Sequence, residues 1–274
     1  MAGTDAPRAQ VAALREAAQR EVAALASDAR TLDAAGWAAP TWCPGWDVRE
    51  IVAHLAEGMD RFGQQVDGAL RGQPVEFSMA ERDARRAQVK ALPDAELIAR
   101  LEQNTAAFYD RLAPLSDDEL SRPIVPMAAG LTPILQVAYL RLHEPALHRW
   151  DVRIMRDAAA TVEPHAAALL SDYVLAGAPR LAKAEALGEG AGVALAETTG
   201  AGGGPVTLRW QGGQVEVTRG AAANPDVTLG LPIETLIRLI WGRLPLAALD
   251  DGRVRVSGDP AAARRLAAAF GNTR

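Results

Sequence analysis

The chain has 274 residues, of which 49% are hydrophobic and 23% are charged, and its formal net charge is −5. This length favours two domains, and the composition is that of an ordinary globular protein. Lys and Arg are scattered along the chain rather than gathered in one segment, which argues against a nucleic-acid-binding surface. With Cys43 as its single cysteine, the chain can form no internal disulfide, and we expect a reducing compartment.

The N-terminal segment and the hydropathy pattern give no sign of a membrane association. The segment MAGTDAPRAQVAALREAAQR carries charges where a signal peptide needs an uninterrupted apolar core. No stretch of about 18 apolar residues occurs that could span a bilayer. We therefore expect a cytoplasmic protein that binds neither membranes nor nucleic acids.

Two long amphipathic helices are predicted in the first part of the chain. The first follows Pro7, carries an apolar stripe at helical spacing and ends near Gly36. The second has a clear start signal, because Asp47 is a favoured N-cap residue and Glu50 follows three positions later. This spacing is typical of a capping box.

Two further long helices complete the helical part of the chain. After helical fragments around 78–91, the pattern predicts a helix over 93–112. A fourth helix is predicted to start with Thr132 as its N-cap and Pro133 at its first position, and to run to about Arg156. Four long helices with intervening loops predict a four-helix bundle.

After about residue 190 the pattern changes to short β-type runs separated by Gly and Pro. The predicted strands are GVALAETT, PVTLRW, QVEVTR, DVTLGL and VRVSG, with a hairpin turn at Gly212-Gly213 and helices from Pro232 and over 260–270. This order predicts a small α+β domain with a mostly antiparallel sheet. The expected organisation is therefore a helical bundle over residues 1–160, a bridging helix within 161–189 and an α+β domain over 190–274.

A candidate metal site lies within the helical part. Glu144 and His148 are four residues apart in LRLHEPALHRWD, so on a helix their side chains share one face. The pair could chelate a metal ion with a third ligand, for which His54 at the edge of its helix's apolar face is the candidate. Two His and one carboxylate leave a tetrahedral zinc with an open position, although non-haem iron uses the same ligands. The spacing alone also fits a solvated contact between neighbouring turns.

Two motifs carry a family resemblance. The segment WCPGWDVREIVAHLAEG, followed about 90 residues later by HEPALHRWD, resembles the mycothiol-dependent maleylpyruvate isomerase family within the wider DinB-like metal-binding superfamily. The resemblance covers nearly the whole chain. It implies a DinB-like four-helix bundle followed by a sterol-carrier-like α+β domain, that is, a two-domain α+β protein. It also implies that the metal ligands fall on His54, Glu144 and His148.

The resemblance further implies a thiol chemistry. Mycothiol, the low-molecular-weight thiol of actinobacteria, would be the thiol cofactor or cosubstrate. A divalent metal, with zinc favoured, would bind its sulfur and favour the thiolate form. Addition of that thiolate to an electrophilic small molecule gives cis-trans isomerisation of a maleylpyruvate-type substrate if rotation and elimination follow, and S-transfer if they do not. We expect a monomer or a small homo-oligomer.

Two arginines in the second domain are candidates for substrate binding. The segment IRLIWGR resembles the family's helix ending in a Gly-Arg pair, which implies Arg243 as the catalytic residue that holds a substrate carboxylate. The alternative is a charge that complements the helix dipole. Arg219 is a weaker candidate.

Two residues beside the predicted ligands have open roles. Pro145 lies inside the metal-bearing helix and is expected to kink it. The kink either has no consequence, or it re-aims Glu144 or opens the site for a different substrate. Asp151 follows His148 by three positions, and it either orients that imidazole or forms a surface pair with Arg149.

The remaining polar residues are interpreted as structural. His143 fits a packing role or a supporting contact to a metal ligand rather than a fourth ligand, and His165 fits a structural role. Cys43 fits a small residue that fixes its loop better than a reactive thiol. Trp46 and its neighbouring tryptophans are interpreted as pinning the same loop. Two other functions stay open. One is a metal-dependent hydrolase that uses His143 as its general base, and the other is a non-enzymatic protein that binds a metal or carries an apolar ligand.

Overall fold

The computed structural model describes residues 6–128 and 130–272. The chain divides between Ala160 and Thr161 into two compact units. The expected domain ranges also contain residues 1–5 and 273–274, which lie outside the described residues, and the exact domain limits stay a prediction. Within the described residues, no helix combines the length and the apolar character that crossing a bilayer requires.

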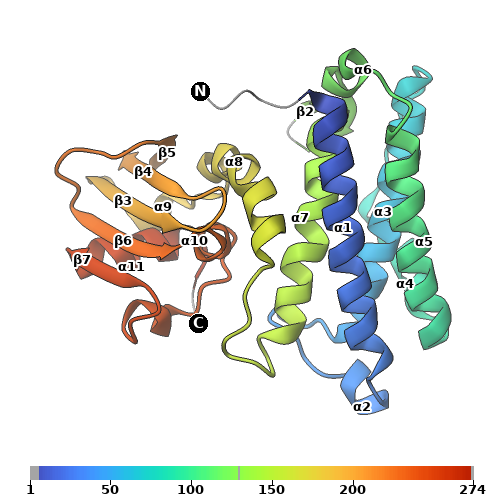
Figure 1. Ribbon diagram of the computed structural model, residues 1–274, viewed down its shortest axis with the longest axis horizontal. Helices are drawn as coiled ribbons and strands as arrows, with labels where there is room; N and C mark the ends of the chain where they lie inside the picture. The colour runs from blue at the N-terminus through green and yellow to red at the C-terminus, as the bar shows by residue number, and fades with distance from the viewer. Residues whose placement is uncertain (1–5, 129, 273–274) are drawn as a thin grey trace. The chain divides into compact units, whose positions relative to one another are not determined.

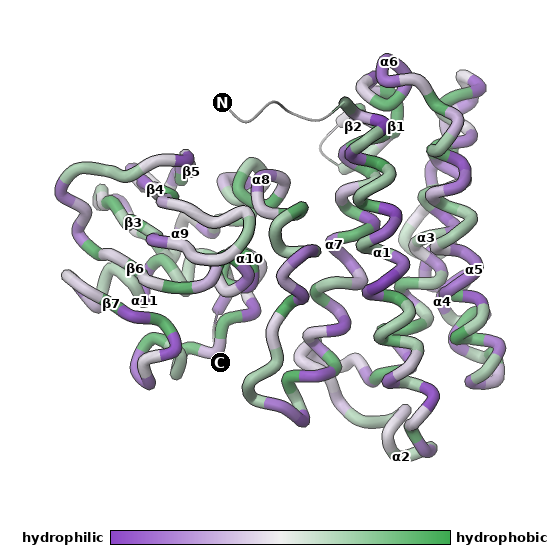
Figure 2. The backbone as a smooth tube through the Cα atoms, viewed as in Figure 1, coloured by the Kyte–Doolittle hydropathy of each residue, from purple (hydrophilic) through white to green (hydrophobic). Residues whose placement is uncertain are grey.

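The first unit is built on four long helices that lie side by side (Figure 1). They are α1 (Pro7–Arg30), α3 (Val48–Leu70), α5 (Asp94–Leu112) and α7 (Ile134–Arg153). Shorter helices lie between them in the chain: α2 (Ala34–Trp37), α4 (Met79–Lys90) and α6 (Asp117–Ser121). Hydrophobic and hydrophilic residues alternate along these helices (Figure 2), as amphipathic helices that bury one face require. The predicted four-helix bundle is confirmed.

The start of α3 agrees with its sequence signal in one respect and differs in another. The Asp47 carboxylate accepts a hydrogen bond from the Glu50 backbone N–H at 2.6 Å, so Asp47 is the N-cap. The Glu50 carboxylate turns instead to α4, where it pairs with Arg86 at 2.6 Å and Lys90 at 2.8 Å. The side chain that would complete the capping box thus ties two helices together.

Two local predictions are wrong. The first helix ends at Arg30 rather than near Gly36, because the Asp33 side chain accepts the Gly36 N–H and starts the separate helix α2. Thr132 is not an N-cap: Pro123–Met127 and Gly130–Pro133 form the antiparallel strands β1 and β2, in which Thr132 pairs with the buried Val125. The backbone of Leu131 and Thr132 pairs with β1, so α7 begins only at Ile134.

The second unit is a five-stranded sheet with helices. Its strands are β3 (Ala191–Thr199), β4 (Gly204–Gln211), β5 (Gln214–Arg219), β6 (Val227–Pro232) and β7 (Arg255–Gly258). Its helices are α8 (Pro164–Leu181), α9 (Ala184–Leu187), α10 (Ile233–Ile240), the 3₁₀ helix η1 (Leu246–Leu249) and α11 (Pro260–Ala269). The strand order is β5-β4-β3-β6-β7, and only the β3–β6 pair is parallel. The predicted α+β class with a mostly antiparallel sheet is confirmed.

Candidate metal centre

Helices α3 and α7 bring the three predicted ligands together. The Nε2 atom of His54 on α3 lies 2.8 Å from Oε2 of Glu144 on α7. Nε2 of His148, one turn further along α7, lies 3.5 Å from the same oxygen. Atoms from all three side chains that could bind a metal lie within 4.8 Å of one another.

The donor set of this cluster fits a divalent cation. Two imidazoles and one carboxylate are ligands that zinc and iron both accept. Donors bound to one tetrahedral zinc at about 2.0–2.1 Å would lie about 3.3 Å from one another. The distances of 2.8 and 3.5 Å to Glu144 lie on either side of that spacing, and all three donors lie within 4.8 Å of one another, so the cluster has the size of a site for one ion.

Two of the three side chains in the cluster are partly exposed. The side chain of His148 is 9% exposed, whereas those of His54 and Glu144 keep 22% and 19% of their surface. Three protein ligands with a free approach are typical of catalytic rather than closed structural metal sites.

The protonation of the cluster follows from its contacts. Burial lowers the pKa of His54, which favours the neutral imidazole that a metal needs. Burial alone would raise the pKa of Glu144, but hydrogen bonds with His148 and His54 and the charge of Arg141 hold it well below its usual range. Glu144 is therefore the ionised member of the group.

His148 is held from behind by a carboxylate. Its Nδ1 lies 2.9 Å from Oδ2 of the fully buried Asp151, and the Cys43 thiol donates to the same oxygen at 3.2 Å. Burial would lower the pKa of His148, but its hydrogen bonds with Asp151, Cys43 and Glu144 raise that pKa well above the usual value. Arg149 pairs with Glu21 at 3.1 Å instead. The structure thus favours the orienting role for Asp151.

Trp46 and Arg141 belong to the surroundings of the cluster, although sequence reasoning assigned neither to it. The Trp46 ring centre lies 4.9 Å from that of His54 and 5.7 Å from that of His148, so the ring walls the site as well as pinning its loop. Arg141 is buried one turn before Glu144. A Cβ at position 58 would lie 2.6 Å from Nη1 of Arg141, so Gly58 makes room for this cation. The only sequence signal is position: Trp46 lies within the first family motif, and Arg141 lies just before the second.

The other predicted residues lie outside the cluster. Helix α7 continues through the buried Pro145 and keeps Glu144 and His148 on the same face. His143 is only 2% exposed and contributes no atom to the ligand groups found among the described residues. His165 is exposed at the start of α8.

The two candidate arginines belong to the second unit. The Arg243 guanidinium donates to the backbone carbonyl of Trp241 at 3.1 Å, and its role in substrate binding stays a prediction. Arg219 forms an ion pair with Asp172 at 2.6 Å and donates to Ser171 at 2.9 Å. These contacts tie β5 to α8 and give Arg219 a structural role.

The fold and the cluster define a class of protein: a helical bundle with a two-histidine, one-carboxylate candidate metal centre, joined to an α+β domain. Comparison with protein families agrees with this class. The mycothiol maleylpyruvate isomerase N-terminal domain matches residues 18–153, and the SCP-2 sterol transfer family matches residues 174–271. The chain belongs to the mycothiol-dependent maleylpyruvate isomerase family, with its two domains in the expected order.

Solved structures show the same fold. A crystal structure of the mycothiol-dependent maleylpyruvate isomerase is 18% identical, covers 85% of this chain and 90% of its own, and has a TM-score of 0.61. A point mutant of such an isomerase is 17% identical, covers 90% and 92%, and has a TM-score of 0.62. No curated protein matches the chain at a significant level.

Proposed function

We propose that the chain is a mycothiol-dependent metalloenzyme that activates a thiol for addition to an electrophilic small molecule. One observation carries the proposal: within a chain of this family, His54, Glu144 and His148 place two imidazoles and one ionised carboxylate around a single partly open point. The metal ligands in this proposal are these three residues. Zinc is favoured by the donor set, and iron is the alternative.

Each residue has a defined task in this proposal. A bound divalent cation would supply the charge that keeps a thiol ionised at neutral pH. Asp151 accepts the Nδ1 proton of His148, so the proton that a metal would have to displace is the one on Nε2, which faces the centre. Glu144 contributes the negative charge, and Trp46 keeps water away from one side of both imidazoles.

The reaction class follows from the family, and its outcome is the finer part of the proposal. Isomerisation of a maleylpyruvate-type substrate and S-transfer both begin with addition of a thiolate to an electrophilic carbon. We propose Arg243 as the residue that binds a carboxylate of the substrate, for which a guanidinium fork is suited. A cytoplasmic location, where thiols are kept reduced, fits this chemistry.

The hydrolase alternative has less support. It needs a general base near the metal-bound water, and His143 was the candidate. That residue is buried and lies outside the ligand groups of the described part of the chain.

Calorimetry with mycothiol tests the proposal. We expect the zinc-loaded wild type to bind the thiol, and both the metal-free protein and His148→Ala to lose that binding, while His165→Ala, which changes an exposed histidine, retains it. A zinc-loaded protein that does not bind mycothiol would overturn the proposal.

Mass spectrometry of the products then separates a released isomer from a stable thioether. Arg243→Gln should raise KM more than it lowers kcat.

A further inference from the structure

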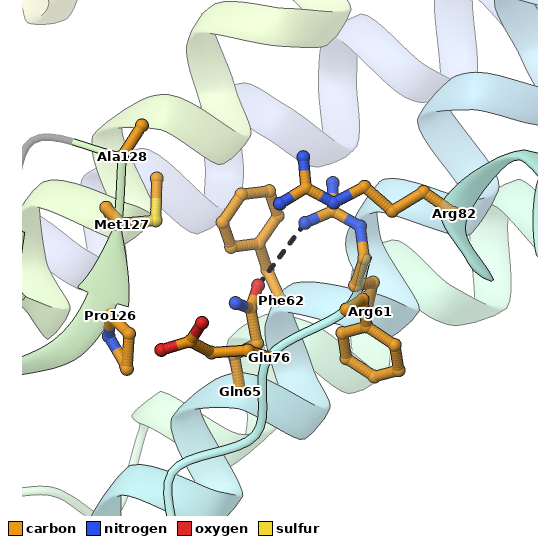
Figure 3. Close-up of a pocket in the computed structure, with 9 residues that line it drawn as sticks. Arg61, Phe62, Gln65, Glu76, Arg82, Pro126, Met127 and Ala128 are labelled. Carbon is orange, nitrogen blue, oxygen red and sulfur yellow. Dashed lines mark hydrogen bonds between the residues drawn. The ribbon is translucent and has the colours of Figure 1, made fainter. Parts of the chain in front are cut away.

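The first unit contains a cavity that the proposed function does not use. Its volume is about 300 Å³, at the lower end of the range of small-molecule sites, and none of the candidate metal ligands lines it. Figure 3 shows the side chains of Arg61, Phe62 and Gln65 from α3 and of Arg82 from α4 facing the strand residues Pro126 and Met127 of β1. The cavity therefore has a polar and an apolar side.

Arg61 brings a buried positive charge to this cavity. It is 7% exposed, its Nε donates to the Glu57 carboxylate at 3.0 and 3.3 Å, and its Nη1 donates to Oε1 of Gln65 at 3.3 Å. No hydrogen bond from its Nη2 is found among the described residues. A buried ion pair such as Arg61–Glu57 is costly to desolvate. Because the Nη2 group of Arg61 is not used by this pair and lies at the cavity, it indicates a role beyond stability.

Arg82 brings a second guanidinium to the same place (Figure 3). Its Nε is buried without a hydrogen-bond partner in the described part of the chain, and its Nη1 reaches only the sulfur of Met79, at 3.9 Å. No carboxylate among the described residues pairs with it. Burial lowers the pKa of Arg61, Glu57 opposes this, and the charges of Arg141 and Arg82 lower it further. Two neighbouring guanidiniums of this kind would be stabilised by an anion.

The rest of the lining restricts what that anion is attached to. Phe62, Phe77, Pro126 and Met127 supply apolar lining, and the exposed carboxylate of Glu76 offers a hydrogen-bond acceptor. Arg61 already pairs with the Glu57 carboxylate, so Arg82 is the positive charge of the lining that no carboxylate among the described residues pairs with, and a ligand with one negative charge would suit it. A ligand with a single carboxylate, an apolar body and a hydroxyl group satisfies all three features.

We propose that the cavity between α3, α4 and β1 binds a small hydroxylated ring carboxylate, with the carboxylate on Arg61 and Arg82 and the hydroxyl group toward Glu76. The site goes beyond the proposed thiol chemistry and does not depend on it. The ring lies against the apolar lining residues, and the guanidinium pair supplies charge-assisted hydrogen bonds.

Calorimetry on the full chain tests this site with 4-hydroxybenzoate as the probe. We expect 4-hydroxybenzoate to bind at least tenfold more tightly than 4-hydroxybenzamide, which has the same shape without the charge, and more tightly than benzoate, which lacks the hydroxyl group. Equal binding of the acid and the amide, or no binding of 4-hydroxybenzoate at millimolar concentration, would overturn the proposal.

Matched variants locate the probe. Arg82→Gln should weaken binding at least tenfold, and Arg82→Lys, which keeps the charge without the fork, should weaken it less. Arg100→Gln removes the same charge from an exposed position on α5 and should leave binding unchanged. His148→Ala should also leave it unchanged. Binding lost in His148→Ala but kept in Arg82→Gln would place the carboxylate at the metal centre and refute the site.

Discussion

The Nε2 atom of His54 lies 2.8 Å from Oε2 of Glu144, although the two residues are 90 positions apart in the chain. Their contact joins α3 to α7. A cluster closed in this way exists only when the two helices pack in the correct rotation and register. Its chemistry therefore depends on the bundle as a whole.

The first prediction concerns His54. His54→Ala removes one of three ligands, so zinc affinity should fall by more than about 100-fold, which is the upper end of the loss expected for an outer-shell partner. Competition with a chromophoric chelator and metal analysis after dialysis measure the change. His165→Ala alters an exposed histidine and should retain about one zinc per chain, as the wild type should. Full zinc content in His54→Ala would remove this residue from the centre.

The second prediction concerns the carboxylate behind His148. Asp151→Asn weakens the acceptor that fixes the imidazole at 2.9 Å, so zinc affinity should fall about 10- to 100-fold while the protein stays folded. The same chelator competition, together with a circular dichroism spectrum, measures both effects. Asp110→Asn is the control, because Asp110 is 59% exposed and pairs only with Arg15 among the contacts described. An unchanged affinity in Asp151→Asn would mean that the contact has no orienting role.

The third prediction concerns alkaline stability. Tyr109 is fully buried, its hydroxyl donates to the Ala138 carbonyl at 3.0 Å, and burial raises its pKa above the usual value of the phenol. The folded state thus keeps the proton to a higher pH than the unfolded state. The contribution of Tyr109 is fully present below about pH 10 and is lost above it, by about 1.4 kcal/mol per pH unit.

Replacement of Tyr109 measures how much this residue contributes to the loss of folding stability at alkaline pH. Tyr109→Phe should cost about 1 kcal/mol near pH 7, because the hydrogen bond is removed. Between pH 10 and 11 the variant should lose less stability than the wild type, by about 1 kcal/mol, because the unfolded phenol ionises over this range. Urea denaturation at a series of pH values gives both slopes, and parallel slopes would contradict the burial argument.

The fourth prediction concerns the packing of the sheet. Gly192 on β3 lies opposite the buried Trp210 on β4, and a Cβ at position 192 would come within 2.1 Å of the indole ring. Gly192→Ala should therefore destabilise the second unit by about 1–3 kcal/mol. Gly190→Ala is the matched control, since no atom lies within 4 Å of the added carbon there. Equal melting temperatures for the two variants would show that the indole ring can move.

Much of the secondary structure could be predicted because its signals are local. The Asp47 cap starts α3, and the alternating runs of the second unit form strands at the predicted places. The hairpin over 123–133 was missed because Pro133 suits a helix start as well as a strand end, and only the pairing of Val125 with Thr132 decides between them. Helix propensity was overruled by a cross-strand ladder.

In the candidate metal centre, too, local sequence determined one part and the tertiary structure determined the rest. The i,i+4 spacing of Glu144 and His148 determined that they share a face, because helical periodicity is a property of neighbouring residues. Only the tertiary structure brought Cys43 to Asp151, the Trp46 ring to both imidazoles and a second guanidinium beside Arg61. These contacts join segments that are distant in sequence, and their geometry depends on how whole helices rotate and pack.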